Sequence, residues 1–382
     1  MVSRLKLAAV LATSFAVTTW SAISAAPANT SAFLEQVSAH FAVWDRDGNG
    51  TLSGNEIELA VNDPEMKGPA AAAAVSLRRA IRANRSIESL SLDQITKAVR
   101  HPKDADPKPP KYEAMYESAM KRITEVKREL FVSGTPKLDS LGQGHLGDCF
   151  LLAGLGTVAH NNPERLVKML QPKPGGMIEV AFANGRNLEI HAPTDAELCI
   201  GASTRNDGLW ALTFEKAVGE VFLQRQKTQR HVTPLSIIGV GGTPNRVPEL
   251  ITGHRTRRVG CEAFQKPGLS DAERKTKLDE MRASLIATQK AGRMIVGGTA
   301  PIGKQAIVPG LYYNHSYGVL NYDAERDEVL FWNPIGNAFK PKGPPGLRFG
   351  YPTSYGQFRC PLTETVMWFG SFSVETDEPF VE

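Results

Sequence analysis

The chain has 382 residues, of which 42% are hydrophobic and 22% charged, and its formal net charge at pH 7 is only +4. This length and apolar content suffice for a sizeable hydrophobic core divided between two or more domains. Because the net charge is small and the basic residues are scattered, the composition gives no basis for nucleic-acid binding or for attachment to a membrane surface.

Residues 1–26 have the pattern of a secretory signal peptide. Arg4 and Lys6 form a short basic start, a mostly apolar run follows, and small residues precede Ala26. The apolar run is too short, and too rich in serine and threonine, to anchor the chain in a membrane. We therefore predict a secreted or periplasmic protein without a stable membrane anchor.

The stretch Asp45–Glu56 follows an expected amphipathic helix and has the spacing of a calcium-binding loop. Calcium requires oxygen ligands, a sharp bend at a glycine, and a final glutamate that chelates with both oxygens. The predicted ligands are Asp45, Asp47, Asn49, Thr51, Ser53 and Glu56, with Gly50 at the bend. This spacing is typical of an EF-hand and predicts one bound calcium ion. The alternative interpretation is a polar surface turn.

A second loop without ligands is predicted to pair with the first. The best register places Leu90 at the position that Leu52 occupies in the calcium loop. The ligand positions of the second loop then hold Ala83, Arg85 and Ile87, which cannot bind a cation. Residues 76–100 are therefore predicted to be a metal-free structural partner.

These patterns divide the mature chain into two units. Residues 27–100 form the predicted EF-hand module, 101–111 a stiff linker rich in proline and charge, and 112–382 the larger unit. A helix expected over residues 112–131 is compatible with either unit.

The run Gln143–Leu152 places a cysteine where a glycine-rich turn enters an apolar helix. Glycines in the turn permit tight backbone conformations, and the free N–H groups of a helix N-terminus favour the thiolate form of Cys149. Gln143 supplies an amide that can donate a hydrogen bond to a developing oxyanion. The alternative for a lone cysteine in such a run is an inert core residue. Gly154 and Gly156 cost this helix about 1 kcal/mol each, for which close packing is the expected reason.

Further elements follow in chain order. Asn184-Gly185 predicts a hairpin between Met177–Phe182 and Leu188–Ile190. A core helix is expected over Leu209–Phe222. Near the end, residues 340–355 are predicted to form a solvent-facing loop, and Glu364–Val374 a last buried strand or short helix.

Two strand-like runs, His315–Tyr322 and Glu328–Trp332, flank a polar turn and predict an antiparallel hairpin. His315 and Asn333 are equally distant from residue 324 in that turn, so we expect them to lie opposite each other. An amide oxygen beside an imidazole fixes its tautomer and aims its other nitrogen at a nucleophile. Taken singly, the two residues would be an ordinary histidine and a turn asparagine.

Three stretches resemble the calpain family of papain-like cysteine proteases. These are Gln143–Leu152, Leu209–Ala217, and the pair Asn314–Tyr317 with Trp332–Gly336. The resemblance covers about Leu141 to Val374 and implies that Cys149 is the nucleophile, His315 the base, Asn333 its orienting residue and Gln143 an oxyanion donor. Ile335 departs from the family pattern, which usually has tryptophan there.

The resemblance implies an α+β fold. A helical lobe would carry Cys149 and a β-rich lobe would carry His315 and Asn333, preceded by a small helical EF-hand domain. We predict a secreted, calcium-linked cysteine endopeptidase that cleaves protein or peptide substrates. The alternatives are a catalytically weak, calpain-like calcium-binding interaction protein and a cysteine acyltransferase of the transglutaminase type. The EF-hand module is compatible with a calcium switch or an inhibitory prodomain, and the spacing of Cys149, Cys199, Cys261 and Cys360 permits one disulfide or none.

Overall fold

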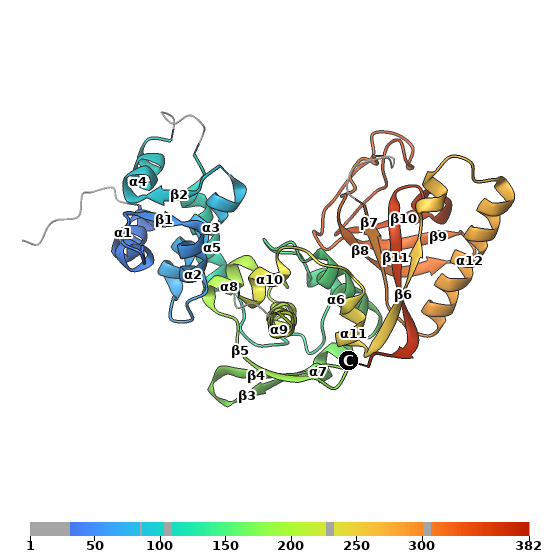
Figure 1. Ribbon diagram of the computed structural model, residues 1–382, viewed down its shortest axis with the longest axis horizontal. Coiled ribbons are helices and arrows are strands. Elements are labelled where there is room, and N and C mark those ends of the chain that lie inside the picture. Colours follow the sequence, from blue (N-terminus) through green and yellow to red (C-terminus); the bar gives the residue numbers. More distant parts are fainter. Residues whose placement is uncertain (1–30, 85, 103–108, 227–232, 301–306, 382) are drawn as a thin grey trace, which may run out of the picture.

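The computed structural model describes residues 31–84, 86–102, 109–226, 233–300 and 307–381 (Figure 1). The predicted signal peptide and most of the predicted linker lie outside these residues. Within the described ranges, no helix is long and apolar enough to cross a membrane.

The N-terminal part consists of two helix–loop–helix units joined by a short antiparallel ladder. Leu52 lies opposite Leu90 in this ladder, which confirms the predicted register. Each exit helix begins with a capping box, formed by Ser53 and Glu56 in the first unit and by Ser91 and Gln94 in the second. The elements are α1 (Ala32–Trp44), β1 (Thr51–Ser53), α2 (Gly54–Val61), α3 (Gly68–Ala83), β2 (Ser89–Ser91) and α4 (Leu92–Arg100).

This N-terminal part packs directly on the helices that follow it. The alanine-rich helix α3 is buried along most of its length and contacts α5 (Tyr112–Glu125) and α8 (Asp195–Ile200). Asp195 accepts hydrogen bonds from the Gly68 N–H at 2.7 Å and from Arg128 at 2.6 Å. Helix α5 ends at Glu125, earlier than predicted, and Tyr112 stacks on Phe33 of α1. One hydrophobic core therefore extends from α1 into the central helices.

The central part surrounds helix α6, which begins at Cys149. The predicted hairpin is confirmed, since Ile178 pairs with Ile190. A Cβ on Gly156 would clash with the indole of Trp332, and a Cβ on Gly154 would clash with Val247, so close packing explains both helical glycines. The elements are η1 (Leu138–Ser140), α6 (Cys149–Asn161), α7 (Pro163–Met169), β3 (Leu170–Lys173), η2 (Pro174–Gly176), β4 (Met177–Ala181), β5 (Asn187–His191), α8, α9 (Trp210–Gln224), α10 (Pro234–Ile238) and α11 (Arg246–Ile251).

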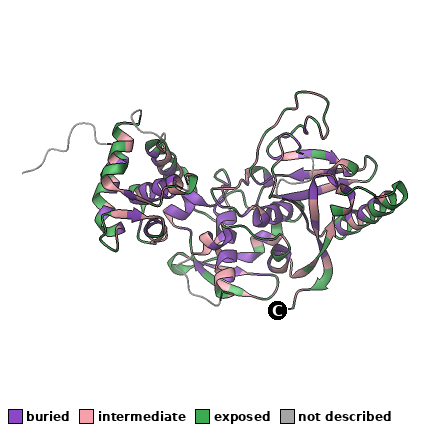
Figure 2. Cartoon of the chain, turned by 45° about the horizontal axis from the view of Figure 1, so that its top comes forward, coloured by how far each residue is buried: buried purple, intermediate pink, exposed green. Residues whose placement is uncertain are grey.

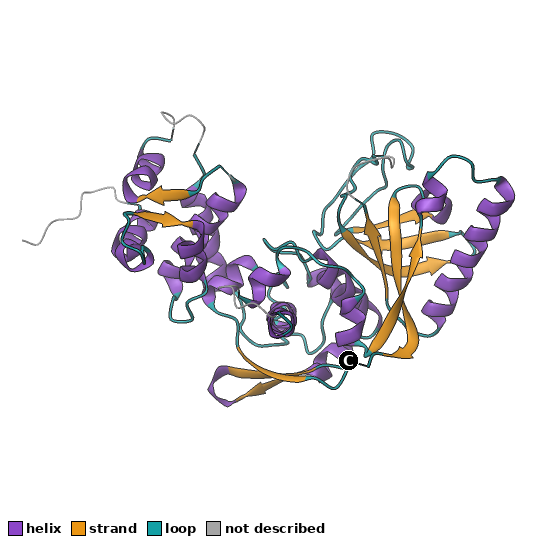
Figure 3. Cartoon of the chain, in the orientation of Figure 1, coloured by secondary structure: helices purple, strands orange, loops and turns teal. Residues whose placement is uncertain are grey.

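The C-terminal part is an antiparallel sheet of six strands in the order β10-β9-β8-β7-β11-β6 (Figure 3). Its own hydrophobic core is rich in aromatic rings, among them Tyr317, Phe331 and Phe369. The elements are β6 (His254–Gly260), η3 (Glu262–Gln265), α12 (Asp271–Lys290), β7 (Ile295–Thr299), β8 (Ser316–Asp323), β9 (Glu328–Trp332), β10 (Gln357–Pro361), α13 (Leu362–Thr365) and β11 (Phe369–Pro379).

Helices α6 and α12 both pack against this sheet. Helix α12 lies at the outer side of the molecule and is largely exposed, whereas α6 contacts β7 and β8 and is buried almost completely (Figure 2). The segment 340–355 is not wholly solvent-facing as predicted, because Tyr351 and Thr353 are buried. The predicted last element is divided into α13 and β11.

Candidate active site

Cys149 is the first residue of α6 and is half-buried. The pKa of its thiol is raised, mainly by burial, although the backbone N–H and the hydroxyl of Ser316 oppose this shift, so the predicted preference for the thiolate is not seen in the free chain. Ser316 directly follows His315, so the residue whose groups act on the Cys149 thiol is the neighbour of the predicted base. All four cysteines belong to the described residues and are free, so the structure contains no disulfide between them.

His315 and Asn333 are joined by a hydrogen bond of 2.8 Å between Nε2 and Oδ1. The orientation of the Asn333 amide is fixed, because its oxygen also accepts the Ile335 N–H at 3.1 Å and its nitrogen donates to Asn337 at 2.8 Å. Nε2 of His315 must therefore carry the hydrogen in the neutral ring, which leaves Nδ1 free to accept a proton. Burial lowers the pKa of His315, and the bond to Asn333 opposes this shift.

The predicted proximity of His315 and Asn333 is confirmed, but the predicted register is wrong by two residues. Gly318 pairs with Trp332, so the ladder directs Asn333 toward Tyr317 rather than toward His315. The turn is centred between residues 325 and 326 rather than at residue 324, because Asp323 pairs with Glu328, and the irregularity between Val319 and Asn321 takes back one residue of this offset. His315 reaches Asn333 as a diagonal neighbour, about 7–8 Å away between backbones in such sheets.

Aromatic residues flank the imidazole of His315. The ring of Tyr317 meets it edge-on at 5.1 Å between centroids, and the ring of Tyr312 lies at 5.8 Å. Ile335 is 41% exposed. Trp332 is buried against Gly156. Tyr312 and Tyr317 therefore cover the histidine in this chain.

Gln143 connects the glycine-rich turn with the segment that follows Asn333. Its backbone N–H donates to the carbonyl of Pro334 at 2.8 Å. Its side-chain nitrogen donates to the carbonyl of Leu146 at 2.7 Å and lies 3.5 Å from Oδ1 of Asp148. The side chain is thus held within its own loop, next to the first turn of α6, with its amide nitrogen directed toward the Leu146 carbonyl and Asp148.

Sequence reasoning did not identify Ser316, Asp148 or Glu215 as part of this site. Asp148, which directly precedes Cys149, and Glu215 are completely buried and lie within hydrogen-bonding reach of each other. A signal was present, because each is an acid in an otherwise apolar stretch. Their proximity depends on how α6 packs near α9, which the local sequence does not reveal.

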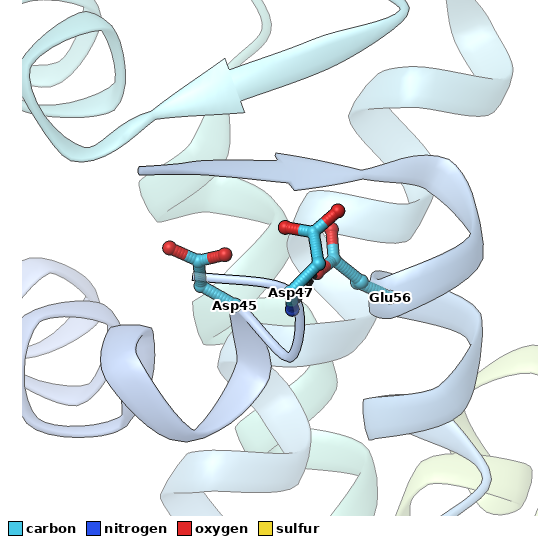
Figure 4. A group of neighbouring side chains, drawn as sticks. All are labelled: Asp45, Asp47 and Glu56. Carbon is cyan, nitrogen blue, oxygen red and sulfur yellow. Dashed lines mark hydrogen bonds between the residues drawn. The ribbon is translucent and has the colours of Figure 1, made fainter. Parts of the chain in front are cut away.

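The predicted calcium loop brings three carboxylates together (Figure 4). Ligand oxygens of Asp45, Asp47 and Glu56 all lie within 4.8 Å of one another. The remaining predicted side chains are bonded inside the loop: Asn49 accepts from Thr51 at 2.7 Å, and Ser53 donates to Glu56 at 2.7 Å. This set of hard oxygen donors fits a calcium ion.

A thiol at a helix N-terminus and an imidazole bonded to an asparagine, on a mixed α/β scaffold, are the groups that a cysteine peptidase uses. The model of the calpain family of cysteine proteases matches residues 103–343, a range that includes Cys149, His315 and Asn333. The chain therefore belongs to the calpain family, and its protease domain implies protein substrates. A search of curated proteins found no match.

Proposed function

We propose that the chain is a secreted, calcium-linked cysteine endopeptidase with a triad of Cys149, His315 and Asn333. The hydrogen bond of 2.8 Å between His315 and Asn333 is the observation that carries this proposal. Ser316 adds support, because the groups that oppose the rise in the pKa of the proposed nucleophile belong to the residue after the proposed base. Secretion rests on the signal pattern of residues 1–26.

The proposed mechanism follows from the tautomer of His315. Nδ1 accepts the thiol proton as Cys149 attacks the peptide carbonyl, and the imidazolium then returns a proton to the departing amine. The backbone N–H of Cys149 and the amide of Gln143 stabilise the oxyanion. Water hydrolyses the resulting thioester with His315 as general base.

The papain-like division into a helical lobe and a β-rich lobe is part of this proposal. Two separate hydrophobic cores support it. Helix α6 and strand β8 approach so closely that a Cβ on Gly318 would stand 2.8 Å from the Thr157 hydroxyl and 2.9 Å from the Ala153 carbonyl. Ala153 lies one helical turn after Cys149, and Gly318 lies three residues after His315, so this contact supports the proposed approach of nucleophile and base.

The pH dependence of activity tests the role of His315. Because burial lowers its pKa below the usual 6.5, the ring stays neutral, and able to accept a proton, down to a pH below that value. We expect the acid limb of kcat/KM, measured with a fluorogenic peptide, to lie below pH 6.5. Asn333→Ala removes the bond that opposes the shift, so its limb should move further toward acid while kcat falls. A limb above pH 6.5 in the wild type would contradict this assignment.

We further propose that the N-terminal part is an EF-hand module that links activity to calcium. Calpain-family proteases are in general regulated by calcium. Asp45, Asp47, Asn49, Ser53 and Glu56, with the backbone of Thr51, would hold the ion, whose charge would offset the repulsion between the carboxylates. The contacts favour a supporting role over an inhibitory one, because α3 packs on α8, and the end of α8 binds the active-site turn through the bond from the His145 N–H to the Ile200 carbonyl.

Glu56→Gln tests the calcium link without breaking the helix cap. Gln94, a neutral residue, already makes the equivalent capping contact in the second loop. Its side-chain oxygen accepts a hydrogen bond from the Ser91 N–H at 2.8 Å. We expect calcium affinity, measured by calorimetry, to fall on the order of 100-fold, because the bidentate carboxylate is lost. Casein cleavage should then require correspondingly more calcium.

Asp93→Asn is the matched control, because it removes one exposed carboxylate from the neighbouring helix α4. It should leave affinity and cleavage unchanged. Unaltered calcium-dependent cleavage in Glu56→Gln would exclude the link, and cleavage indifferent to a chelator would leave a protease with a structural N-terminal module. Incorporation of primary amines in place of cleavage would instead identify an acyltransferase.

A further inference from the structure

Asp148, which precedes Cys149, and Glu215 are buried acids, and each has one carboxyl oxygen without a hydrogen-bond partner among the described residues. Glu215 Oε2 accepts the Ala202 N–H at 2.7 Å, and Asp148 Oδ1 faces the Gln143 amide at 3.5 Å. Among the described residues, Asp148 Oδ2 and Glu215 Oε1 have no hydrogen-bond donor. The two side chains lie within hydrogen-bonding reach of each other and are 0% exposed. Two carboxylates in such contact cannot both be ionised, whereas one proton between them satisfies both oxygens.

We propose that Asp148 and Glu215 share one proton at neutral pH and act as a positioning pair for the nucleophile. The shared proton holds the Asp148 carboxyl in the interior, away from the N-terminus of α6. The free N–H groups of that helix end then remain available to the thiolate and to the oxyanion. This inference rests on the proposed role of Cys149.

The position of Asp148 explains why such a device is needed. Asp148 is the N-cap residue of α6, where an aspartate ordinarily accepts a hydrogen bond from the first turn. In the described structure its side chain makes no such bond. An ionised Asp148 also opposes the thiolate, since its charge raises the pKa of Cys149. Sharing a proton with Glu215 on α9 moves part of the negative charge away from the sulfur.

The charged groups around the pair fit a single net negative charge. Arg122 of α5 approaches Glu215 and donates to the carbonyls of Gly201 and Ala202 at 3.2 and 2.7 Å. Lys216 on α9 is occupied by Glu197 of α8 at 2.8 Å. Cys149 is the titratable group that faces the pair from α6. Burial raises the pKa of both carboxyl groups, which retains the proton.

Two isosteric variants mimic the two positions of the proton. In Asp148→Asn, the amide at the N-terminus of α6 is a permanent hydrogen-bond donor and Glu215 carries the negative charge. In Glu215→Gln, the amide on α9 is the donor and Asp148, beside Cys149, carries the negative charge. The rate of Cys149 alkylation by iodoacetamide as a function of pH reports its pKa. We expect this pKa to fall in Asp148→Asn and to rise in Glu215→Gln, so that alkylation rates at pH 7 differ roughly tenfold between the variants.

Opposite shifts distinguish a positioning pair from a structural one, because general damage would move both variants in the same direction. Glu249→Gln, which alters a partly buried acid on α11, should leave the alkylation profile unchanged. Shifts of equal sign in Asp148→Asn and Glu215→Gln, or no shift in either, would overturn the proposal.

Infrared spectroscopy of the wild type tests for the shared proton even if neither variant folds. The wild type at pH 7 should show the carbonyl stretch of a protonated, buried carboxylic acid, and that band should be missing from each folded variant. Its absence from the wild type overturns the shared proton. If the band is present but Cys149 is not alkylated selectively, the shared proton is supported and the proposed function is the part that fails.

Discussion

Cys149→Ala is expected to lower kcat for casein cleavage on the order of 10⁴-fold or more, because loss of a covalent nucleophile leaves only binding and oxyanion stabilisation. The replaced side chain is half-buried at the first residue of α6, so the free energy of unfolding should change by only about 1 kcal/mol. Cleavage with calcium and with chelator, together with a thermal melt of the same sample, measures both effects.

Cys199→Ala is the matched control for this experiment. Cys199 is buried on α8, and burial raises the pKa of its thiol to about 12. Burial likewise raises the pKa of Cys261 to about 12 and that of Cys360 to about 11. Cys149 is half-buried whereas the other three cysteines are buried, so iodoacetamide at neutral pH should label Cys149 alone in the wild type, and Cys199→Ala should keep its activity. Full activity in Cys149→Ala would show that another residue is the nucleophile. Selective labelling of Cys149 without substrate cleavage would favour the alternative of a calcium-binding interaction protein.

Gly144→Ala is expected to damage both stability and activity. A Cβ on Gly144 would overlap the backbone carbonyl of Gly201. The turn cannot move away easily, because the Gly142 N–H donates to Ser203 at 2.8 Å and the His145 N–H donates to Ile200 at 2.7 Å. We expect a loss of about 1–3 kcal/mol in the free energy of unfolding. Displacement of Gln143 and Cys149 should lower kcat/KM on the order of 100-fold.

Gly142→Ala, two residues away, makes the same chemical change in open space. A Cβ at Gly142 meets no described atom within 4 Å, and the backbone there has no positive φ. This variant should unfold within about 0.5 kcal/mol of the wild type and keep its activity. Chemical denaturation and kcat/KM of the two variants should therefore differ clearly. Equal behaviour would show that the turn is not held as tightly as these contacts indicate.

Several elements were predictable because their signals are local. The spacing of Asp45–Glu56 and the position of Leu90 led to the correct ladder, since loops of fixed length leave a single register. The hairpin around Asn184-Gly185 followed from turn chemistry. In the second hairpin the same reasoning found the correct neighbours but the wrong register. The strands pair about a centre between residues 325 and 326, as Asp323 opposite Glu328 shows, and counting along a polar turn does not reveal which of its residues form the centre.

The sequence by itself determined which residues are proposed to carry the chemistry, namely the cysteine box, the histidine with its asparagine, and the oxygen-bearing side chains of the loop, because each set lies within short stretches of sequence. Only the tertiary structure decided what surrounds them. The indole of Trp332 requires a glycine at position 156, and Glu215 meets Asp148, the residue before Cys149. Such contacts join helices and strands that are distant in the chain. They depend on the packing of whole elements, whose geometry no local pattern of residues specifies.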